Sequence, residues 1–311
     1  IRKNYYKIMR INDHICLFYY IYSSFSIVFC TFAVFNLKIN MAKKVLFINQ
    51  EITPFVPETN MSIMGKELPQ KAQEAGLEIR TFMPKWGNIN ERRGQLHEVI
   101  RLSGMNLIID DTDHPLIIKV ASIPQSRIQV YFIDNDDYFT KRQMTIDEEG
   151  NEYADNGERA IFFARGVLET VKKLRWVPDI IHCQGWMSAV VPLYIKTAYH
   201  DEPSFANTKI VTSLFHEQPK GELGSKFRDI VAFRDAKLEL MKCYNEKFDF
   251  LELGKLALDY SDCVIEANKD VNNNLLKYAN NKNIPVLNYP GEDFIGAYKE
   301  LYEKICPTEE E

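Results

Sequence analysis

Three patterns that would point to common ligand-binding chemistry are missing from this 311-residue sequence. No Gly-x-Gly-x-x-Gly follows any predicted strand, which disfavours an unrelated nucleotide-binding Rossmann module. The six cysteines form no Cys-x-x-Cys pair and no metal-ligand spacing, so reduced cytosolic thiols are favoured over a disulfide framework. The net charge of −5 lacks the excess of Lys and Arg that a general nucleic-acid surface requires. We therefore expect no cofactor, no metal and no nucleic-acid partner.

The first forty residues lack glycine and proline, and their composition differs from that of the rest. Residues 16–37 carry no charged side chain, and such a run is long enough for a transmembrane or signal-anchor segment. The alternative is translated upstream DNA with the true start at Met41, because residue types with AT-rich codons dominate and Met41 leads directly into a predicted strand. We favour this alternative and predict that residues 1–40 lie outside the fold, without a membrane association.

From residue 41 onwards, short apolar runs alternate with helical patterns. Buried strands are predicted at 43–50, 77–84, 178–183, 209–215, 262–267 and 284–289. Helices are predicted at 61–75, 157–174, 186–199, 226–247, 251–260, 270–280 and 291–305. Short alternating runs over 94–133 indicate an inserted hairpin region. The alternation predicts a doubly wound, mainly parallel, Rossmann-like α/β sheet in one domain over 41–306, followed by an acidic tail at 307–311.

Ligands of such folds bind at the carboxyl ends of parallel strands, and polar stretches fall there. Asp155 and Asn156 directly precede the 157–174 helix, so capping of that helix is as good an interpretation as a role in a cleft. Glu51 follows the first strand, where it either contacts a ligand or merely ends the strand. The acidic run at 134–139 has no second ligand cluster at metal spacing, which favours a solvated loop over a Ca²⁺ or Mg²⁺ site.

Five segments in order resemble the N-terminal catalytic domain of bacterial glycogen synthases and plant starch synthases. They are VLFINQEITPFV, VYFIDNDDYF, YADNGERAIFFARGVLE, PDIIHCQGWMSAVVPLYI and LGKLALDYSDCVIEANKDV. The resemblance runs from Lys43 to about Ala279, and the chain looks most like short, single-domain members from Bacteroides-type bacteria. That family consists of retaining glycosyltransferases with two Rossmann-like domains that face a cleft. The resemblance implies that this chain is the single N-terminal half of such a fold and lacks the second domain, which holds most nucleotide-sugar contacts.

The turn after the first strand departs from the family pattern. The family places Lys-x-Gly-Gly-Leu-x-Asp where this chain has Pro57 to Ile63. Pro57 has no N–H to donate, and the charge of Glu58 would repel a diphosphate. We expect Thr59 or Asn60 to cap the following helix instead, without diphosphate binding.

The family's His-x-His-Asp-Trp-His turn is also reduced in this chain. The corresponding residues are His182, Cys183, Gln184, Gly185, Trp186 and Met187. The resemblance implies substrate-binding roles for Glu51, Asn156, Gln184 and Trp186, and it makes Asp155 and His182 the catalytic candidates. A lone His182 can equally be a hydrogen-bonded structural residue, and Trp186 can be packing.

Two functional classes follow from the resemblance. The first is a glycogen or starch synthase-type glycosyltransferase of the cytoplasm, which moves glucose from ADP-glucose or UDP-glucose to an α-1,4-glucan. The second is a non-catalytic relative, a pseudoenzyme that binds a glucan or a protein partner. The family assignment favours the first, whereas the altered turn favours the second for this chain alone. Aromatic residues at the strand ends, including Phe55, Tyr138, Trp186 and Phe215, predict a face covered by a glucan, by a second protein or second copy, or by the chain's own C-terminal segment.

Overall fold

The structure is a computed structural model that describes residues 42–124, 126, 128–216 and 219–307. The residues from Lys43 onwards form one compact unit. The apolar segment at 16–37 lies outside the described residues, as does most of the acidic tail. Within the described part of the chain, no helix combines the length and the apolar character that crossing a membrane requires.

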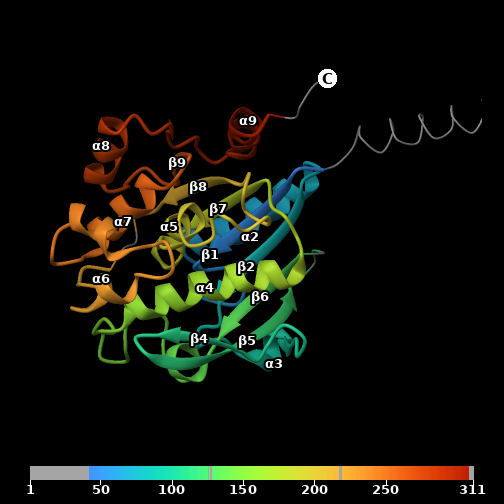
Figure 1. Cartoon of the computed structure of the whole chain (residues 1–311). Helices are drawn as coiled ribbons and strands as arrows, with labels where there is room; N and C mark the ends of the chain where they lie inside the picture. Colours follow the sequence, from blue (N-terminus) through green and yellow to red (C-terminus); the bar gives the residue numbers. More distant parts are fainter. Residues whose placement is uncertain (1–41, 125, 127, 217–218, 308–311) are drawn as a thin grey trace, which may run out of the picture. The chain divides into compact units, whose positions relative to one another are not determined.

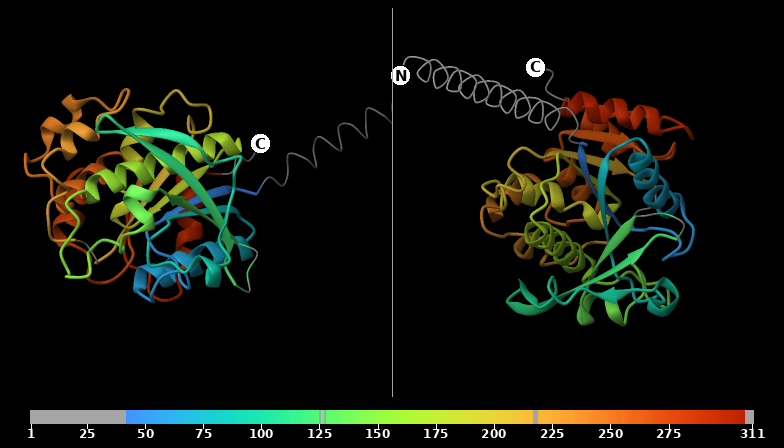
Figure 2. Two further views of the ribbon diagram at one scale, coloured as in Figure 1. Left: turned by 90° about the horizontal axis from the view of Figure 1, so that it is seen from below. Right: turned by 90° about the vertical axis from the view of Figure 1, so that its right-hand side faces the viewer.

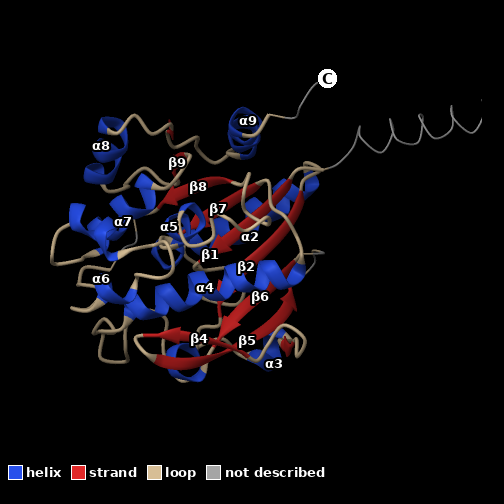
Figure 3. Cartoon of the chain, viewed as in Figure 1, coloured by secondary structure: helices blue, strands red, loops and turns tan. Residues whose placement is uncertain are grey.

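A mainly parallel sheet organises these residues (Figures 1 and 3). Its parallel strands are β1 (Lys44–Asn49), β2 (Glu78–Pro84), β6 (Gln129–Asp134), β7 (Ile180–Gln184), β8 (Lys209–Leu214), β9 (Cys263–Glu266) and β10 (Val286–Leu287). Their spatial order is β10-β9-β8-β7-β1-β2-β6, so the strand order reverses beside β1. This reversal defines a doubly wound sheet, and the predicted fold class is confirmed.

The predicted hairpin region forms the antiparallel edge of the sheet. Strand β5 (Thr112–Ser122) pairs antiparallel with β6, while β3 (His97–Glu98) and β4 (Met105–Ile109) pair with β5. Asp110 and Asp111 have positive φ values of 44° and 62°, which suit the tight two-residue turn between β4 and β5. The short helix α3 (Glu91–Gly94) precedes β3.

Helices cover both faces of the sheet. Side chains of β1 alternate between two cores, with Leu46 and Ile48 in one and Val45 and Phe47 in the other. The first core includes α4 (Asn156–Leu174), α5 (Val191–Lys196) and α7 (Phe250–Asp259). The second includes α2 (Asn60–Glu74) and α9 (Ile295–Ile305). Figure 2 shows α2 and α4 on opposite sides of the sheet. Burial on both faces explains why β1 is a continuous apolar run in the sequence.

The C-terminal half contains the main departures from the sequence-based prediction. The helix expected at 226–247 is instead α6 (Phe227–Ile230) and a 3₁₀ helix (Leu238–Cys243), with an irregular connection between them. Arg234 in this connection has a φ of 50°, which an α-helix does not accommodate. The predicted 186–199 helix is divided into a 3₁₀ turn (Trp186–Ser188) and α5. Helix α8 (Asn273–Asn281) lies close to its predicted position.

Candidate functional site

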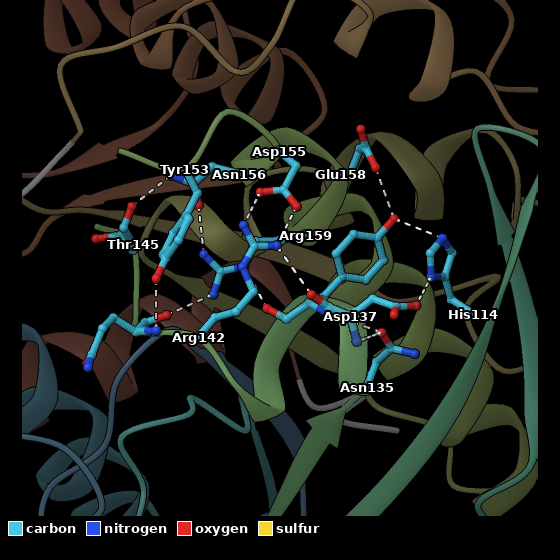
Figure 4. Close-up of polar contacts among 12 residues, drawn as sticks. His114, Asn135, Asp137, Arg142, Thr145, Tyr153, Asp155, Asn156, Glu158 and Arg159 are labelled. Atoms are coloured by element: carbon cyan, nitrogen blue, oxygen red, sulfur yellow. Dashed lines mark hydrogen bonds and ion pairs between the residues drawn. The ribbon is translucent and has the colours of Figure 1, made fainter. Parts of the chain in front are cut away.

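The polar residues at the end of β6 and the start of α4 form one connected group (Figure 4). After β6, Asn135 begins a five-residue π-helical turn, and its side-chain oxygen accepts hydrogen bonds from the backbone N–H groups of Asp137 and Tyr138. Helix α4 starts nearby in the chain, after Asp155. The fold therefore brings two loop segments together at the carboxyl edge of the sheet, where doubly wound folds bind ligands.

Asp155 occupies the N-cap position of α4, but its side chain makes no capping hydrogen bond. Its two carboxylate oxygens instead accept hydrogen bonds from Arg142, at 2.5 and 2.7 Å. The guanidinium of Arg142 also lies 4.3 Å from the centre of the Tyr153 ring. A two-pronged pair of this kind fixes the orientation of both side chains. The side chain of Asp155 is therefore oriented by Arg142 and does not cap the helix.

Asn156 and Arg159 fix the loop that carries Arg142. Arg159 is fully buried and donates hydrogen bonds to the Asn156 side-chain oxygen at 2.9 Å, to the Tyr138 carbonyl at 2.9 Å and to the Gln143 carbonyl at 3.1 Å. The Asn156 amide nitrogen donates to the Thr145 carbonyl at 3.0 Å. Burial, together with the nearby charge of Arg142, lowers the pKa of Arg159 to about 10, which leaves it protonated at neutral pH. Asn156 therefore positions the loop through contacts within the protein.

A hollow of about 470 Å³ opens beside this group. It is lined by Gly87, Thr140, Lys141, Arg142, Gln143, Asp147, Glu148, Glu149 and Tyr153. The lining offers both donors and acceptors, which suit the hydroxyl groups of a sugar. Its three consecutive carboxylates oppose the binding of a diphosphate through charge repulsion.

A second chain of hydrogen bonds borders the group on its β5 side. The Tyr138 hydroxyl donates to Glu158 at 3.0 Å, while the His114 ring nitrogens lie 3.1 Å from the Tyr138 hydroxyl and 2.9 Å from Asp137. Burial and the charge of Glu158 raise the pKa of Tyr138 well above its usual value. This chain ties β5, the π-helical turn and α4 together.

The turn after β1 is closed by its own side chains. Thr59 caps α2, as predicted, and forms a capping box in which the Ser62 N–H donates to the Thr59 hydroxyl and the Thr59 N–H donates to the Ser62 hydroxyl. The Thr59 hydroxyl in turn donates to the Glu51 carboxylate at 2.7 Å, and the Gln50 side chain donates to the same carboxylate at 3.1 Å. The start of α2 therefore lies beside a carboxylate of the chain itself.

His182 lies inside the core beneath α9. Its Nδ1 is 2.6 Å from the Tyr302 hydroxyl and its Nε2 is 2.6 Å from the Ser213 hydroxyl, and the side chain is fully buried. Burial lowers the pKa of His182 to about 3, so the ring is neutral at physiological pH. Because Tyr302 belongs to α9 and Asp155 precedes α4, the two catalytic candidates lie toward opposite faces of the sheet. The structure does not bring them into one site.

Gln184 and Trp186 are also buried. Both amide atoms of Gln184 lack a hydrogen-bond partner within the described residues, as does the side-chain oxygen of Asn49, its register neighbour on β1. The Trp186 ring packs edge to face against Phe250, with ring centres 4.9 Å apart. Substrate-binding roles for Glu51, Asn156, Gln184 and Trp186 stay predictions.

Protein side chains cover the aromatic rings that the sequence places at the strand ends, and coverage of this face by a glucan or a partner stays a prediction. Phe55, Tyr138 and Trp186 are buried in the larger core, and Phe215 packs with Met61. Helix α9, near the C-terminal end of the described chain, covers His182 through Tyr302. The sequence reasoning missed Arg142 and Gln143, which lie outside any recognisable motif, and it gave no role to Tyr153, which opens the family-like segment at 153–169.

Within the described ranges, no three His, Cys, Asp or Glu side chains are grouped so that they could hold a metal ion. Cys183, Cys243, Cys263 and Cys306 are free thiols, and Cys183 and Cys263 are buried.

A doubly wound sheet with a polar, partly buried group at its carboxyl edge defines a Rossmann-type ligand-binding domain. The chain belongs to the starch synthase catalytic domain family, whose model matches residues 44–282. The predicted family is therefore confirmed. The narrower resemblance to Bacteroides-type members stays a prediction.

Individual relatives agree with this assignment. A glycogen synthase from Chlorobium luteolum is 39% identical over 184 residues, which cover 59% of this chain and 38% of the relative. A glycogen synthase from Pelodictyon phaeoclathratiforme is 33% identical over 228 residues, covering 73% of this chain and 46% of the relative. The chain thus spans less than half the length of these relatives.

A solved structure agrees at the level of the fold. The catalytic domain of starch synthase IV from Arabidopsis thaliana, bound to ADP and acarbose, matches 80% of this chain and 51% of its own. Its TM-score is 0.64 and its sequence identity is 15%.

Proposed function

We propose that this chain is the glucan-binding half of a glycogen synthase-type glycosyltransferase, whose acceptor is an α-1,4-glucan and whose donor is a nucleotide-activated glucose. The observation that carries the proposal is the Asp155–Arg142 pair, which borders a polar hollow at the carboxyl edge of a family-matched sheet. In this arrangement the Asp155 carboxylate accepts hydrogen bonds from sugar hydroxyls and the Arg142 guanidinium donates to them. Asn156 and Arg159 act as positioning residues.

The donor diphosphate requires groups other than the turn at Pro57–Ile63. Transfer with departure of a nucleoside diphosphate depends on electrostatic stabilisation of that diphosphate. The capping box occupies the backbone N–H groups of Thr59 and Ser62, and the Glu51 carboxylate lies against the same turn. A phosphate at this helix start would meet like charge and few free donors. ADP-glucose and UDP-glucose would thus be held by other residues or by a partner protein.

The same closed turn favours a second candidate function, a glucan-binding relative without transfer activity.

We further propose that the family-type domain extends over residues 41–306 and that residues 1–40 lie outside it. The free thiols and the proposed substrates suit a reducing cytoplasm, where we place the protein.

Calorimetric titration of the full chain tests the proposal. Maltotriose should bind saturably, and Asp155→Asn should weaken its binding about tenfold, because a charged acceptor is replaced by a neutral amide. Asp136→Asn is the matched control, since Asp136 is exposed on the adjacent turn, whereas the carboxylate paired with Arg142, which lines the hollow, is that of Asp155. Binding of ADP-glucose or UDP-glucose without any binding of maltotriose would contradict the proposal. Glucose transfer to glycogen in the same preparation separates the two candidate functions.

A further inference from the structure

A second hollow, of about 360 Å³, lies at the amino edge of the sheet, where β2 and β6 begin. Its lining residues are Gln73, Glu78, Ile79, Arg80, Arg101, Ile128, Gln129, Tyr131 and Leu174. Leu174 ends the 19-residue helix α4, which Asp155 precedes, so about 28 Å of helix separates this amino-edge hollow from the Asp155–Arg142 pair. Figure 1 shows α4 alongside β6. The amino-edge hollow is therefore a separate site.

Aromatic side chains fix the guanidinium of Arg80 at the wall of this hollow. Its Nη1 donates a hydrogen bond to the Tyr131 hydroxyl at 2.9 Å, and its Cζ lies 5.2 Å from the centre of the Trp176 ring. Contact with a ring face orients a guanidinium without neutralising its charge. Because Arg80 is half-buried and held in this way, its side chain is ordered before a ligand arrives, which lowers the entropic cost of binding.

The positive charge of this hollow is not paired within the described part of the chain. Neither Arg80 nor Arg101 forms an ion pair with a described carboxylate. The carboxylate that the described lining does contain, that of Glu78, accepts a hydrogen bond from the Trp176 indole at 2.6 Å. Two guanidinium groups against one carboxylate leave the lining with a positive net charge, in a chain whose net charge is −5. Such a local excess favours an anionic ligand.

The lining also supplies neutral hydrogen-bond donors for an oxyanion. Gln73 and Gln129 carry amide groups, and the Tyr131 hydroxyl keeps its own proton after it accepts from Arg80. The planar guanidinium presents its N–H groups in a fork that matches two oxygens of a phosphate at once. Charge and donor geometry therefore point to a phosphate group.

The amino-edge hollow is larger than a phosphate group alone requires. Its volume falls within the range of about 300–1,000 Å³ that small-molecule sites occupy. Ile79, Ile128 and Leu174 add apolar surface beside the charged groups, which suits the carbon-bound part of a phosphate ester.

We propose that the amino-edge hollow binds a phosphomonoester, a small organic molecule that carries one phosphate group. The phosphate oxygens accept hydrogen bonds from the guanidinium groups of Arg80 and Arg101, and the organic part lies against the apolar lining. This site goes beyond the proposed function and does not depend on it, because it lies at the opposite edge of the sheet from Asp155.

Calorimetric titration of the full chain with glycerol 3-phosphate and with inorganic phosphate, at constant ionic strength, tests this inference. Both should bind the wild type saturably with a Kd on the order of 1 mM, since two charge-assisted contacts provide a free energy of that size. Arg80→Gln and Arg101→Gln should each weaken glycerol 3-phosphate binding about tenfold. Glu78→Gln should tighten it about threefold, because it removes a like charge while its amide oxygen still accepts from Trp176.

Two further variants serve as controls. Arg92→Gln makes the same change of charge at an exposed residue of α3 that does not line the hollow, and it should bind glycerol 3-phosphate as the wild type does. Asp155→Asn should also retain wild-type affinity for this ester, because Asp155 lies at the other end of α4.

The outcomes separate this inference from the proposed function. Absence of saturable glycerol 3-phosphate binding to the wild type would overturn it, as would wild-type affinity in Arg101→Gln. An equal loss in Arg92→Gln would also overturn it, because net charge alone would then explain the effect. Binding of inorganic phosphate without the ester would overturn the assigned ligand class. None of these results bears on glucan binding, which maltotriose tests separately. Arg101 is exposed, so circular dichroism of Arg101→Gln should show an unchanged fold.

Discussion

Lowering the pH should destabilise the protein through the buried His182. In the folded state the pKa of this ring is about 3, because it is buried between the sheet and α9. In the unfolded chain its pKa is about 6.5. Below pH 6.5, His182 therefore binds a proton in the unfolded state but not in the folded state. The stabilisation is fully present above pH 6.5 and is lost as the pH falls toward 3.

The size of this effect follows from the two pKa values. Between pH 8 and pH 5, the proton uptake of the unfolded chain at His182 lowers the free energy of unfolding by about 2 kcal/mol. Other groups also titrate over this range, so the quantity to measure is the difference between wild type and a variant. His182→Gln should be less stable at pH 8, because it disturbs the contacts with Tyr302 and Ser213, but it lacks this titration.

Urea unfolding at pH 8, 6.5 and 5 provides the assay. We expect wild type to lose about 2 kcal/mol more stability than His182→Gln between pH 8 and pH 5. The exposed His97 provides the matched control, and His97→Gln should retain the wild-type pH dependence. An equal decrease in the free energy of unfolding between pH 8 and pH 5 for wild type and His182→Gln would refute the reasoning. It would show that the buried ring titrates normally in the folded protein.

Three further predictions concern other parts of the molecule. Replacing Pro57–Ile63 by Lys-Thr-Gly-Gly-Leu-Ala-Asp should create measurable ADP-glucose affinity in calorimetry and cost about 1 kcal/mol through the lost cap; tight ADP-glucose binding by the unaltered chain would defeat this idea. Arg159→Lys should lower the free energy of unfolding by about 3 kcal/mol in urea titrations, since three hydrogen bonds depend on the guanidinium; a loss below about 0.5 kcal/mol would show that the loop is held otherwise. Alkylation followed by peptide mapping should modify the exposed Cys243 well before Cys183, whose burial raises the pKa of its thiol, and equal rates would contradict the described burial.

Local sequence patterns predicted the strands and α4 well, because burial on both faces leaves continuous apolar runs and α4 has a long amphipathic period. The Thr59 cap was also predictable, since capping depends on a side chain and its next few residues. The 226–247 segment was not, because the left-handed Arg234 and the pairing of Phe233 with Ala236 depend on tertiary context.

The candidate site was predictable in part. Asp155 and Asn156 came from a recognisable segment, but their partner Arg142 lies in a loop without periodicity, so its contribution emerges only when the loop folds back. His182 and Gln184 stand at a strand end, yet sequence position alone does not reveal that α9 covers the face of β7 on which His182 lies. A residue at the carboxyl end of a strand therefore lies near the edge of the sheet where ligands bind. That position does not show that the side chain is accessible to a ligand.

Electrophoresis of the full chain through native gels with and without embedded glycogen tests the central claim most directly. The account predicts that glycogen retards wild-type protein and the Asp136→Asn control, and that it retards Asp155→Asn much less. Wild-type migration that is unaffected by glycogen would contradict the claim that this domain binds an α-glucan.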